Sequence, residues 1–214
     1  MSSTFVPRGG TIEVVCGPMF SGKSEELIRR LRLSIIARQR VQVFKPAIDN
    51  RYAETEVVSH SNVRISAQCV SHASDILEHL DDRTDVIGVD EAQFFDAGVV
   101  EVCEALANRG KRVIVAGLDL DYRGRPFEPM PQLMAIAEFV TKHHAVCMVC
   151  GEPACRSQRL AGGDSVVEVG TNDRYEARCR RHHEPEMSRQ LDLLAARRQA
   201  MAVPTRRDNE GAGA

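Results

Sequence analysis

Residues 14–28, "VVCGPMFSGKSEELI", decide the fold class of this chain. They contain a gapless match to the pattern GxxxxGK[ST], a phosphate-binding loop that lies between a strand and a helix. The residues that lead into the match, "TIEVVC", are mostly apolar or β-branched and stop at a glycine, as a buried strand does. After the match, apolar residues three and four positions apart predict an amphipathic helix from Ser24 to about Arg38.

The motif also predicts how an anion would be bound. Glycines let successive backbone N–H groups point inward, and the helix N-terminus adds its positive dipole end. Lys23 would reach the β- and γ-phosphates of a nucleoside triphosphate, and the Ser24 hydroxyl would bind Mg²⁺. The alternative is an ordinary glycine turn with an exposed lysine, and the matching strand and helix argue against it. The predicted loop comprises Gly17, Pro18, Met19, Phe20, Ser21, Gly22, Lys23 and Ser24.

Two later segments, "DVIGVDE" at 85–91 and "RVIVAGLD" at 112–119, are apolar runs that end in acids. Between them, "AGVVEVCEALANRG" at 97–110 has helical spacing. Because the runs are continuously apolar rather than alternating, they predict parallel strands covered on both faces. The fold class is therefore predicted to be α/β, with a mostly parallel sheet flanked by helices. We also expect a strand at 41–46, a helix at 75–80 and, between 47 and 72, mainly loop with one or two short strands.

Acids at the strand ends are candidates for metal and proton chemistry. A nucleoside-triphosphate site needs a carboxylate at the end of a buried strand to hold Mg²⁺. Asp90 and Asp119 both qualify by position, and Glu91 directly follows Asp90. Two adjacent acids can divide metal binding and proton acceptance, so we favour Asp90 for Mg²⁺ and Glu91 as the general base. In the alternative, Glu91 caps the following turn and Asp119 holds the metal.

The cysteines indicate a metal site rather than disulfides, because their number is odd and most lie late in the chain. Cys147 and Cys150 form one tight pair, and Cys179 and His182 form another. This spacing is expected of a zinc ribbon with Cys₃His ligands, whose four protein ligands indicate a structural role. His183 is the competing fourth ligand. The seven cysteines are Cys16, Cys69, Cys103, Cys147, Cys150, Cys155 and Cys179.

Three other residues near these pairs are given no special role. Cys155 is interpreted as a spare thiol. His143 and His144 precede the first pair, but adjacent residues of a strand face opposite sides, so both are treated as ordinary.

Composition limits the class of partner. The 28 Lys and Arg are matched by 30 Asp and Glu, so no overall positive field attracts nucleic acid. No apolar run is long enough to span a bilayer, and "MSSTFVPRGG" lacks the features of a signal peptide, so we expect no membrane partner and a cytoplasmic location. The expected organisation is a flexible tail at 1–10, a nucleotide-binding α/β domain at 11–140, a zinc-binding domain at 141–185, and a C-terminal helix and disordered tail at 186–214.

Several strings together resemble the thymidine kinases of the cytosolic, zinc-containing type, the type II thymidine kinase family. They are "GPMFSGKSEELIRR", "KPAID", "DEAQFF", "LDLDYRGRPF", "CMVC", "SQRL" and "YEARCRRHH", in the order typical of that family and within about residues 10–185. The resemblance implies a P-loop (RecA-like) core with a small zinc-ribbon-like lasso domain. It also implies transfer of the γ-phosphoryl group of ATP to the 5′-hydroxyl of thymidine to give dTMP, with Mg²⁺. A homotetramer and feedback inhibition by dTTP are further expectations of the resemblance.

The resemblance also implies roles for individual residues. The glutamate at position 91 would be the proton acceptor, in agreement with the choice made above. A flat pyrimidine is well served by aromatic contact, and closure of a loop over it would exclude water. Phe95, next to one of the expected contacts, is assigned to the core. The residues expected to face the nucleoside are Met19, Phe94, Leu118, Tyr122, Phe127, Gly170 and Tyr175.

Two alternatives to this activity are considered. One is a P-loop ATPase that uses a zinc ribbon to bind nucleic acid, which the mildly acidic, aromatic-poor composition disfavours. The other is a nucleoside kinase that prefers deoxyuridine, because a single methyl group is worth only about 1–3 kcal/mol in an apolar pocket.

Overall fold

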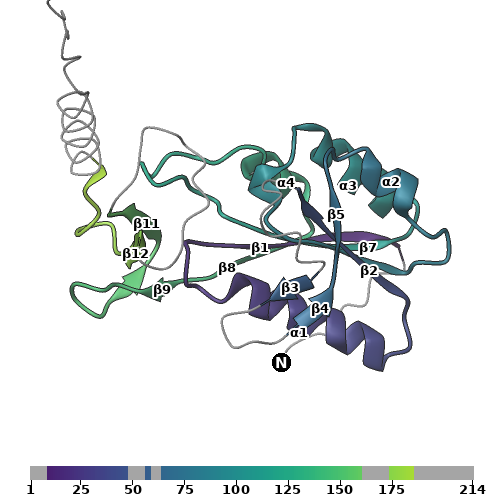
Figure 1. Ribbon diagram of the computed structural model, residues 1–214, viewed down its shortest axis with the longest axis horizontal. Helices are drawn as coiled ribbons and strands as arrows, with labels where there is room; N and C mark the ends of the chain where they lie inside the picture. The colour runs from purple at the N-terminus through teal and green to yellow at the C-terminus, as the bar shows by residue number, and fades with distance from the viewer. Residues whose placement is uncertain (1–8, 48–55, 59–63, 161–173, 186–214) are drawn as a thin grey trace, which may run out of the picture.

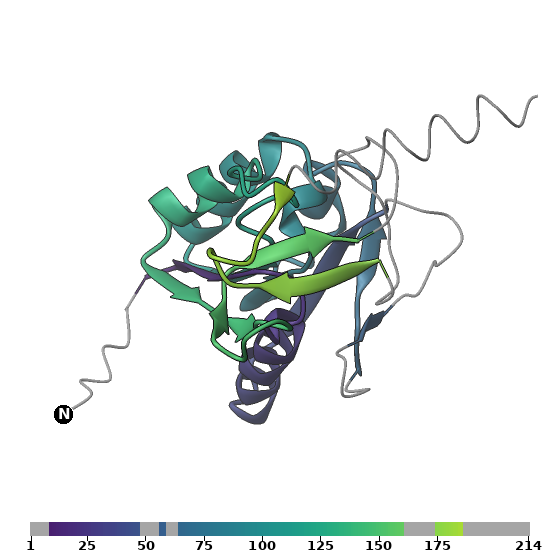
Figure 2. The same ribbon diagram turned by 90° about the vertical axis from the view of Figure 1, so that its left-hand side faces the viewer.

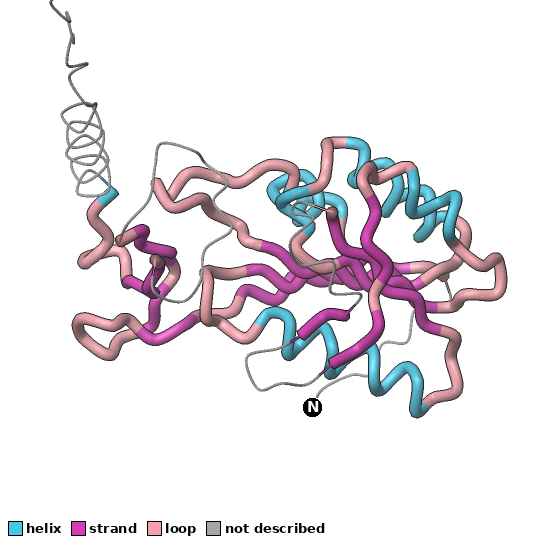
Figure 3. The backbone as a smooth tube through the Cα atoms, in the orientation of Figure 1, coloured by secondary structure: helices cyan, strands magenta, loops and turns pink. Residues whose placement is uncertain are grey.

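The computed structural model describes residues 9–47, 56–58, 64–160 and 174–185. Its centre is a six-stranded sheet in the order β5-β2-β6-β7-β1-β8, and every neighbouring pair is parallel (Figure 1). Helix α1 covers one face, and α2, α3 and α4 cover the other (Figure 3). The strands are β1 (Thr11–Cys16), β2 (Val41–Pro46), β5 (Gln68–Val70), β6 (Val86–Val89), β7 (Arg112–Gly117) and β8 (Phe139–Lys142). The helices are α1 (Lys23–Ile36), α2 (Asp75–His79), α3 (Gly98–Asn108) and α4 (Met130–Ile136).

The apolar pattern explains why helices cover both faces of the sheet. Along β1, Ile12 and Val14 belong to the core cluster beneath α2, α3 and α4, whereas Val15 belongs to the cluster beneath α1. Helix α1 contributes Leu27 and Leu31 to that second cluster, and both side chains are fully buried. Every residue of β6 is buried, as expected for a strand covered on both faces. The predicted parallel α/β fold is therefore confirmed.

Some expected boundaries change in the structure. Helix α1 ends at Ile36 rather than near Arg38. Within the described residues of 47–72 there are three short strands, where one or two were expected: β3 (Glu56–Val58) and β4 (Arg64–Ser66) pair with each other, and β5 joins the edge of the main sheet. Strands of three residues carry too little alternation to be recognised in a sequence. Phe95 is buried in the core, as predicted.

A small lobe follows β8 and contains two short antiparallel pairs. They are β9 (Ala145–Val146) with β10 (Pro153–Ala154), and β11 (Arg156–Arg159) with β12 (Tyr175–Arg178). Figure 2 shows the β11–β12 pair facing the viewer. The apolar core of this lobe contains three alanines, Cys147 and, packed at its side, Phe20 and Cys179. A core this small cannot hold a lobe together through apolar burial alone.

Two predicted features cannot be compared with the structure. The C-terminal helix and tail expected at 186–214, and residues 1–8 of the flexible tail expected at 1–10, lie outside the described residues. None of the helices within the described ranges combines the length and apolar character needed to cross a bilayer.

Candidate functional site

The phosphate loop joins the end of β1 to the start of α1 and has a backbone that favours glycine. Gly17 has φ 143° and Gly22 has φ 78°, in the region that L side chains rarely adopt. A Cβ atom on Gly17 would lie 2.5 Å from the His143 carbonyl oxygen, so the first glycine is also required by close packing. Phe20 has φ 63°, a conformation uncommon for a bulky residue and typical of functional turns.

Side chains of the loop fold back onto its own backbone. The Lys23 ammonium donates to the Pro18 carbonyl at 2.8 Å, and the Ser21 hydroxyl donates to the same carbonyl at 2.8 Å. Burial lowers the pKa of Lys23, while Glu91 and Asp90 act in the opposite direction. The lysine charge is therefore held at the centre of the loop, where an anion would meet it.

Ser24 and Asp90 bring two oxygen donors together at the carboxyl ends of the parallel strands. Asp90 follows β6, is buried, and places Oδ2 3.5 Å from the Ser24 hydroxyl oxygen. Burial, followed by the charge of Glu91, raises the pKa of Asp90 to about 7. A hydroxyl and a carboxylate are hard ligands that suit Mg²⁺, which would keep the carboxylate ionised.

Glu91 lies at the start of a 3₁₀ turn (Ala92–Phe94) with a left-handed backbone, φ 51°. Its carboxylate makes no capping bond to this turn and instead accepts a hydrogen bond from Gln93 Nε2 at 2.5 Å. The carbonyl oxygen of the same Gln93 side chain accepts from the Leu118 backbone N–H at 2.9 Å. Gln93 thus orients the acid and ties it to the segment that follows β7.

Asp119, the alternative metal acid, is engaged differently. Lys142 places its ammonium nitrogen 2.5 Å from Asp119 Oδ2. A carboxylate already paired with an ammonium group is less suited to a metal than the Asp90 and Ser24 pair.

The four aromatic residues expected to face a nucleoside fall into two pairs, one in direct contact and one joined through an arginine. The rings of Phe94 and Phe127 meet edge to face, with centroids 5.9 Å apart. The Arg159 guanidinium lies 3.7 Å from the centroid of the Tyr122 ring, and Arg159 Nε donates to the Tyr175 hydroxyl at 3.0 Å. Arg159, which is fully buried, therefore connects two tyrosines that lie far apart in the sequence.

The other expected contacts are only partly placed. Leu118 adjoins the glutamate through Gln93, as described above. The Met19 backbone N–H donates to the Ser157 hydroxyl at 2.9 Å, which links the phosphate loop to β11 of the small lobe. Gly170 lies outside the described residues.

Four residues with evident roles in this geometry were not among the expected site residues: Gln93, His143, Ser157 and Arg159. His143 was expected to have no special role. Its Nδ1 lies 3.0 Å from the Ser21 carbonyl oxygen, and its backbone N–H donates to the Cys16 carbonyl oxygen at 2.8 Å. The signal that could have found three of them is their place in strings that carry the resemblance: Gln93 lies in "DEAQFF", and Ser157 and Arg159 lie in "SQRL".

The cysteine pairs converge in the small lobe. Ligand atoms of Cys147, Cys150, Cys179 and His182 all lie within 4.8 Å of one another. The Sγ atoms of Cys150 and Cys179 are 3.9 Å apart, and His182 Nδ1 lies 3.3 Å from Cys179 Sγ. Tetrahedral ligands at Zn–S distances of about 2.3 Å stand about 3.8 Å apart, so the set fits zinc.

Groups near Cys147 favour the thiolate form of its side chain. Burial alone would raise the pKa of the Cys147 thiol, but backbone N–H groups and His182 act more strongly together and lower it to about 5. A thiolate is the form that binds zinc. His183 points elsewhere, with Nε2 2.9 Å from the Tyr122 carbonyl oxygen, and Cys155 is not a member of the cluster.

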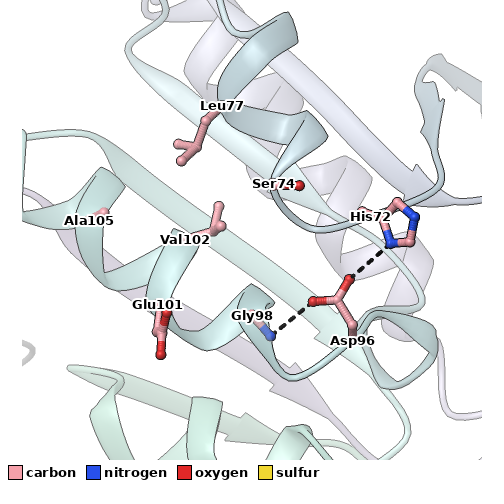
Figure 4. Close-up of a pocket in the computed structure, with 8 residues that line it drawn as sticks. All are labelled: His72, Ser74, Leu77, Asp96, Gly98, Glu101, Val102 and Ala105. Atoms are coloured by element: carbon pink, nitrogen blue, oxygen red, sulfur yellow. Dashed lines mark hydrogen bonds and ion pairs between the residues drawn. The ribbon is translucent and has the colours of Figure 1, made fainter.

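A surface groove between α2 and α3 is separate from these residues. It has a volume of about 410 Å³, and Asp96 at its rim lies 3.9 Å from the His72 ring and accepts from the Gly98 N–H (Figure 4). None of the residues that line it is a predicted site residue.

Comparison with known proteins gives a consistent result. The family model described as thymidine kinase matches residues 10–183. A protein named thymidine kinase from a Rhodothermus species is 58% identical over 195 residues, 91% of this chain and 91% of that protein. Another from Bdellovibrio bacteriovorus is 56% identical over 184 residues, 86% of this chain and 90% of that protein. Domain III of the Thermotoga maritima replication initiation protein DnaA has a TM-score of 0.38 and 13% identity over 64% of this chain and 56% of that one, too low to carry an argument.

Proposed function

The chain belongs to the thymidine kinase family, and from this premise we propose that it transfers the γ-phosphoryl group of ATP to the 5′-hydroxyl of thymidine, giving dTMP and ADP. The observation that carries the proposal is the position of Glu91. Glu91 directly follows Asp90 in the sequence, and its carboxylate accepts a hydrogen bond from Gln93. The Gln93 side chain also accepts from the Leu118 N–H, which links Glu91 to the segment that carries expected nucleoside contacts.

The residues of the chain divide the work of the reaction. The phosphate loop holds the triphosphate through its backbone N–H groups and Lys23. Ser24 and Asp90 would hold Mg²⁺, which would supply positive charge to the bound phosphates. Glu91 accepts the proton of the 5′-hydroxyl while the new O–P bond forms and the bond from the γ-phosphorus to the bridging oxygen breaks.

The nucleoside is held by an apolar wall. We assign to it Met19, Phe94, Leu118, Tyr122, Phe127, Gly170 and Tyr175. The edge-to-face contact of Phe94 with Phe127 and the link from Tyr122 through Arg159 to Tyr175 support this assignment. Such a wall suits a flat pyrimidine and excludes water, which would otherwise compete with the hydroxyl as phosphoryl acceptor.

Zinc at Cys147, Cys150, Cys179 and His182 has a structural role in the proposal, because four protein ligands leave no open position for a substrate. We propose the corresponding division into a nucleotide-binding domain at 11–140 and a zinc-binding lasso domain at 141–185. The small apolar core of this lobe supports a need for metal.

The proposal extends to assembly and regulation. We assign a cytoplasmic location, feedback inhibition by dTTP and a homotetramer. Self-association is supported by exposed apolar side chains at the end of α1, where Ile36 is 76% exposed, and on edge strand β8, where Phe139 is 42% exposed.

Phosphate transfer from radiolabelled ATP to a panel of nucleosides tests the function. Thymidine, deoxyuridine, deoxycytidine and deoxyguanosine are compared, in parallel with ATP hydrolysis with and without single-stranded DNA. We expect labelled dTMP, with deoxycytidine and deoxyguanosine refused, and no stimulation by DNA. Preference for deoxyuridine would change the substrate, and DNA-stimulated hydrolysis without transfer would overturn the proposal.

Lys23→Ala is expected to weaken ATP binding by at least about tenfold and to leave the fold intact. The substitution removes the cation at the centre of the phosphate loop, and each tenfold change in affinity corresponds to about 1.4 kcal/mol. Titration with a non-hydrolysable ATP analogue measures the effect, and Arg29→Ala on the exposed side of α1 is the matched control. Unchanged analogue binding and transfer in Lys23→Ala would contradict the role assigned to the loop.

A further inference from the structure

Lys142 and Asp119 form an ion pair beside the phosphate loop that no step above uses. In the sheet, β1 lies between β7 and β8, so that Cys16 pairs with Gly117 on one side and with Lys142 on the other. Asp119 lies two residues beyond the end of β7. The ion pair therefore spans the end of β1, at the point where the chain enters the phosphate loop at Gly17.

The negative charge of Asp119 depends on the Lys142 ammonium group for its neutralisation. The Asp119 side chain is only 4% exposed, whereas that of Lys142 is 42% exposed. Within the described residues neither Asp119 carboxylate oxygen accepts a hydrogen bond of good geometry, and the Lys142 ammonium lies 2.5 Å from Oδ2. A buried carboxylate without donors or countercharge is strongly unfavourable, and its field reaches further because water does not screen it.

The charge of Asp119 affects the pKa values of Cys16, which precedes the phosphate loop, and of Lys23 within it. Burial, followed by the charge of Asp119, raises the pKa of the Cys16 thiol to about 11, and Lys142 and Lys23 act in the opposite direction. Burial lowers the pKa of Lys23, and the charge of Asp119 acts in the opposite direction, after those of Glu91 and Asp90. Three carboxylates thus add negative charge near Lys23, the residue expected to meet the phosphates.

We propose that Lys142 is a positioning residue for the triphosphate, because it cancels the charge of the buried Asp119 carboxylate beside the phosphate loop. In the proposed function Asp90 would be compensated by the Mg²⁺ that it would hold and Glu91 would take the proton, whereas Asp119 has no role in that reaction. Without Lys142, an uncancelled negative charge at the entrance of the loop would oppose the phosphates. The inference rests on the proposed function in taking the bound anion to be ATP and in the roles given to Asp90 and Glu91.

The test measures binding of Mg²⁺ with a non-hydrolysable ATP analogue by calorimetry, together with kcat and both KM values. Lys142→Met is expected to weaken analogue binding and raise the KM for ATP by about tenfold, or about 1.4 kcal/mol, with the KM for thymidine unchanged. The double variant Lys142→Met/Asp119→Asn is expected to bind within about threefold of wild type, because both charges are gone. Lys142→Arg keeps the pair, and Asp119→Asn alone should bind the analogue at least as tightly as wild type.

Lys111→Met is the matched control. It removes the same charge at the opposite end of β7, where Lys111 donates to the Asp82 and Thr84 carbonyls, and should leave analogue affinity unchanged. Unchanged analogue affinity in Lys142→Met, whatever its thermal stability, would overturn the proposal.

Other outcomes separate the remaining explanations. Weak analogue binding that persists in the double variant would show that Lys142 contacts the phosphates itself. Loss of Mg²⁺-dependent binding in Asp119→Asn would show that Asp119 is a metal ligand. Each result contradicts the proposal. If Lys142→Met does not fold, the double variant still decides, because the proposal requires it to bind normally. Since analogue binding needs no thymidine, failure here is distinct from failure of the proposed function.

Discussion

Glu91→Gln is expected to lower kcat by a factor of about 10²–10⁴, while analogue binding and folding stay close to wild type. The amide cannot accept the proton that leaves the 5′-hydroxyl. It can still accept the hydrogen bond that Gln93 Nε2 now donates to the carboxylate, so the link through Gln93 to Leu118 is expected to persist. The loss should therefore fall on turnover rather than on substrate binding.

Single-turnover transfer to thymidine, measured beside analogue binding, separates these two effects. Glu104→Gln, the same chemical change on the exposed side of α3, is the control and should behave as wild type. Turnover of Glu91→Gln at the wild-type rate would remove the general base from the proposal and would leave positioning by the phosphate loop as the main source of catalysis.

Cys147→Ser is expected to abolish stoichiometric zinc binding and to unfold the small lobe. Zinc contributes about 10–16 kcal/mol of apparent binding free energy in small zinc domains, and this lobe has only a minor apolar core to replace it. The damage should reach the active site, because Ser157 of the lobe accepts the Met19 N–H of the phosphate loop. Elemental analysis for zinc and hydrogen exchange of the lobe measure the two effects.

Cys155→Ser is the matched control for this variant. Cys155 lies in the same lobe but outside the cluster of four ligand residues, so its replacement should leave the zinc content at one per chain. A wild-type zinc content in Cys147→Ser would contradict the ligand set, and a zinc-free lobe with wild-type exchange protection would contradict the structural role of the metal.

Much of the fold could be predicted from the sequence because its signals are local. The GxxxxGKS motif, the strand before it and the helical spacing after it lie within one short stretch, and the predicted strand β1 has the bounds seen in the structure. The continuous apolar character of 86–89 predicted a strand covered on both faces, and all four residues are buried. Short strands such as β5 could be expected between 47 and 72 but not placed there, because three residues are too few to show a period.

The sequence by itself determined the α/β class, the phosphate loop and the pairs of cysteine and histidine, because each depends on residues within a few positions of one another. Only the tertiary structure decided which side chains lie together where spacing left alternatives open. His182 lies in the cysteine cluster, whereas His183 lies against the Tyr122 carbonyl. Asp90 faces Ser24, whereas Asp119 faces Lys142. These choices depend on which strand ends the sheet order brings together, and that order follows from packing both faces of the sheet rather than from any local pattern.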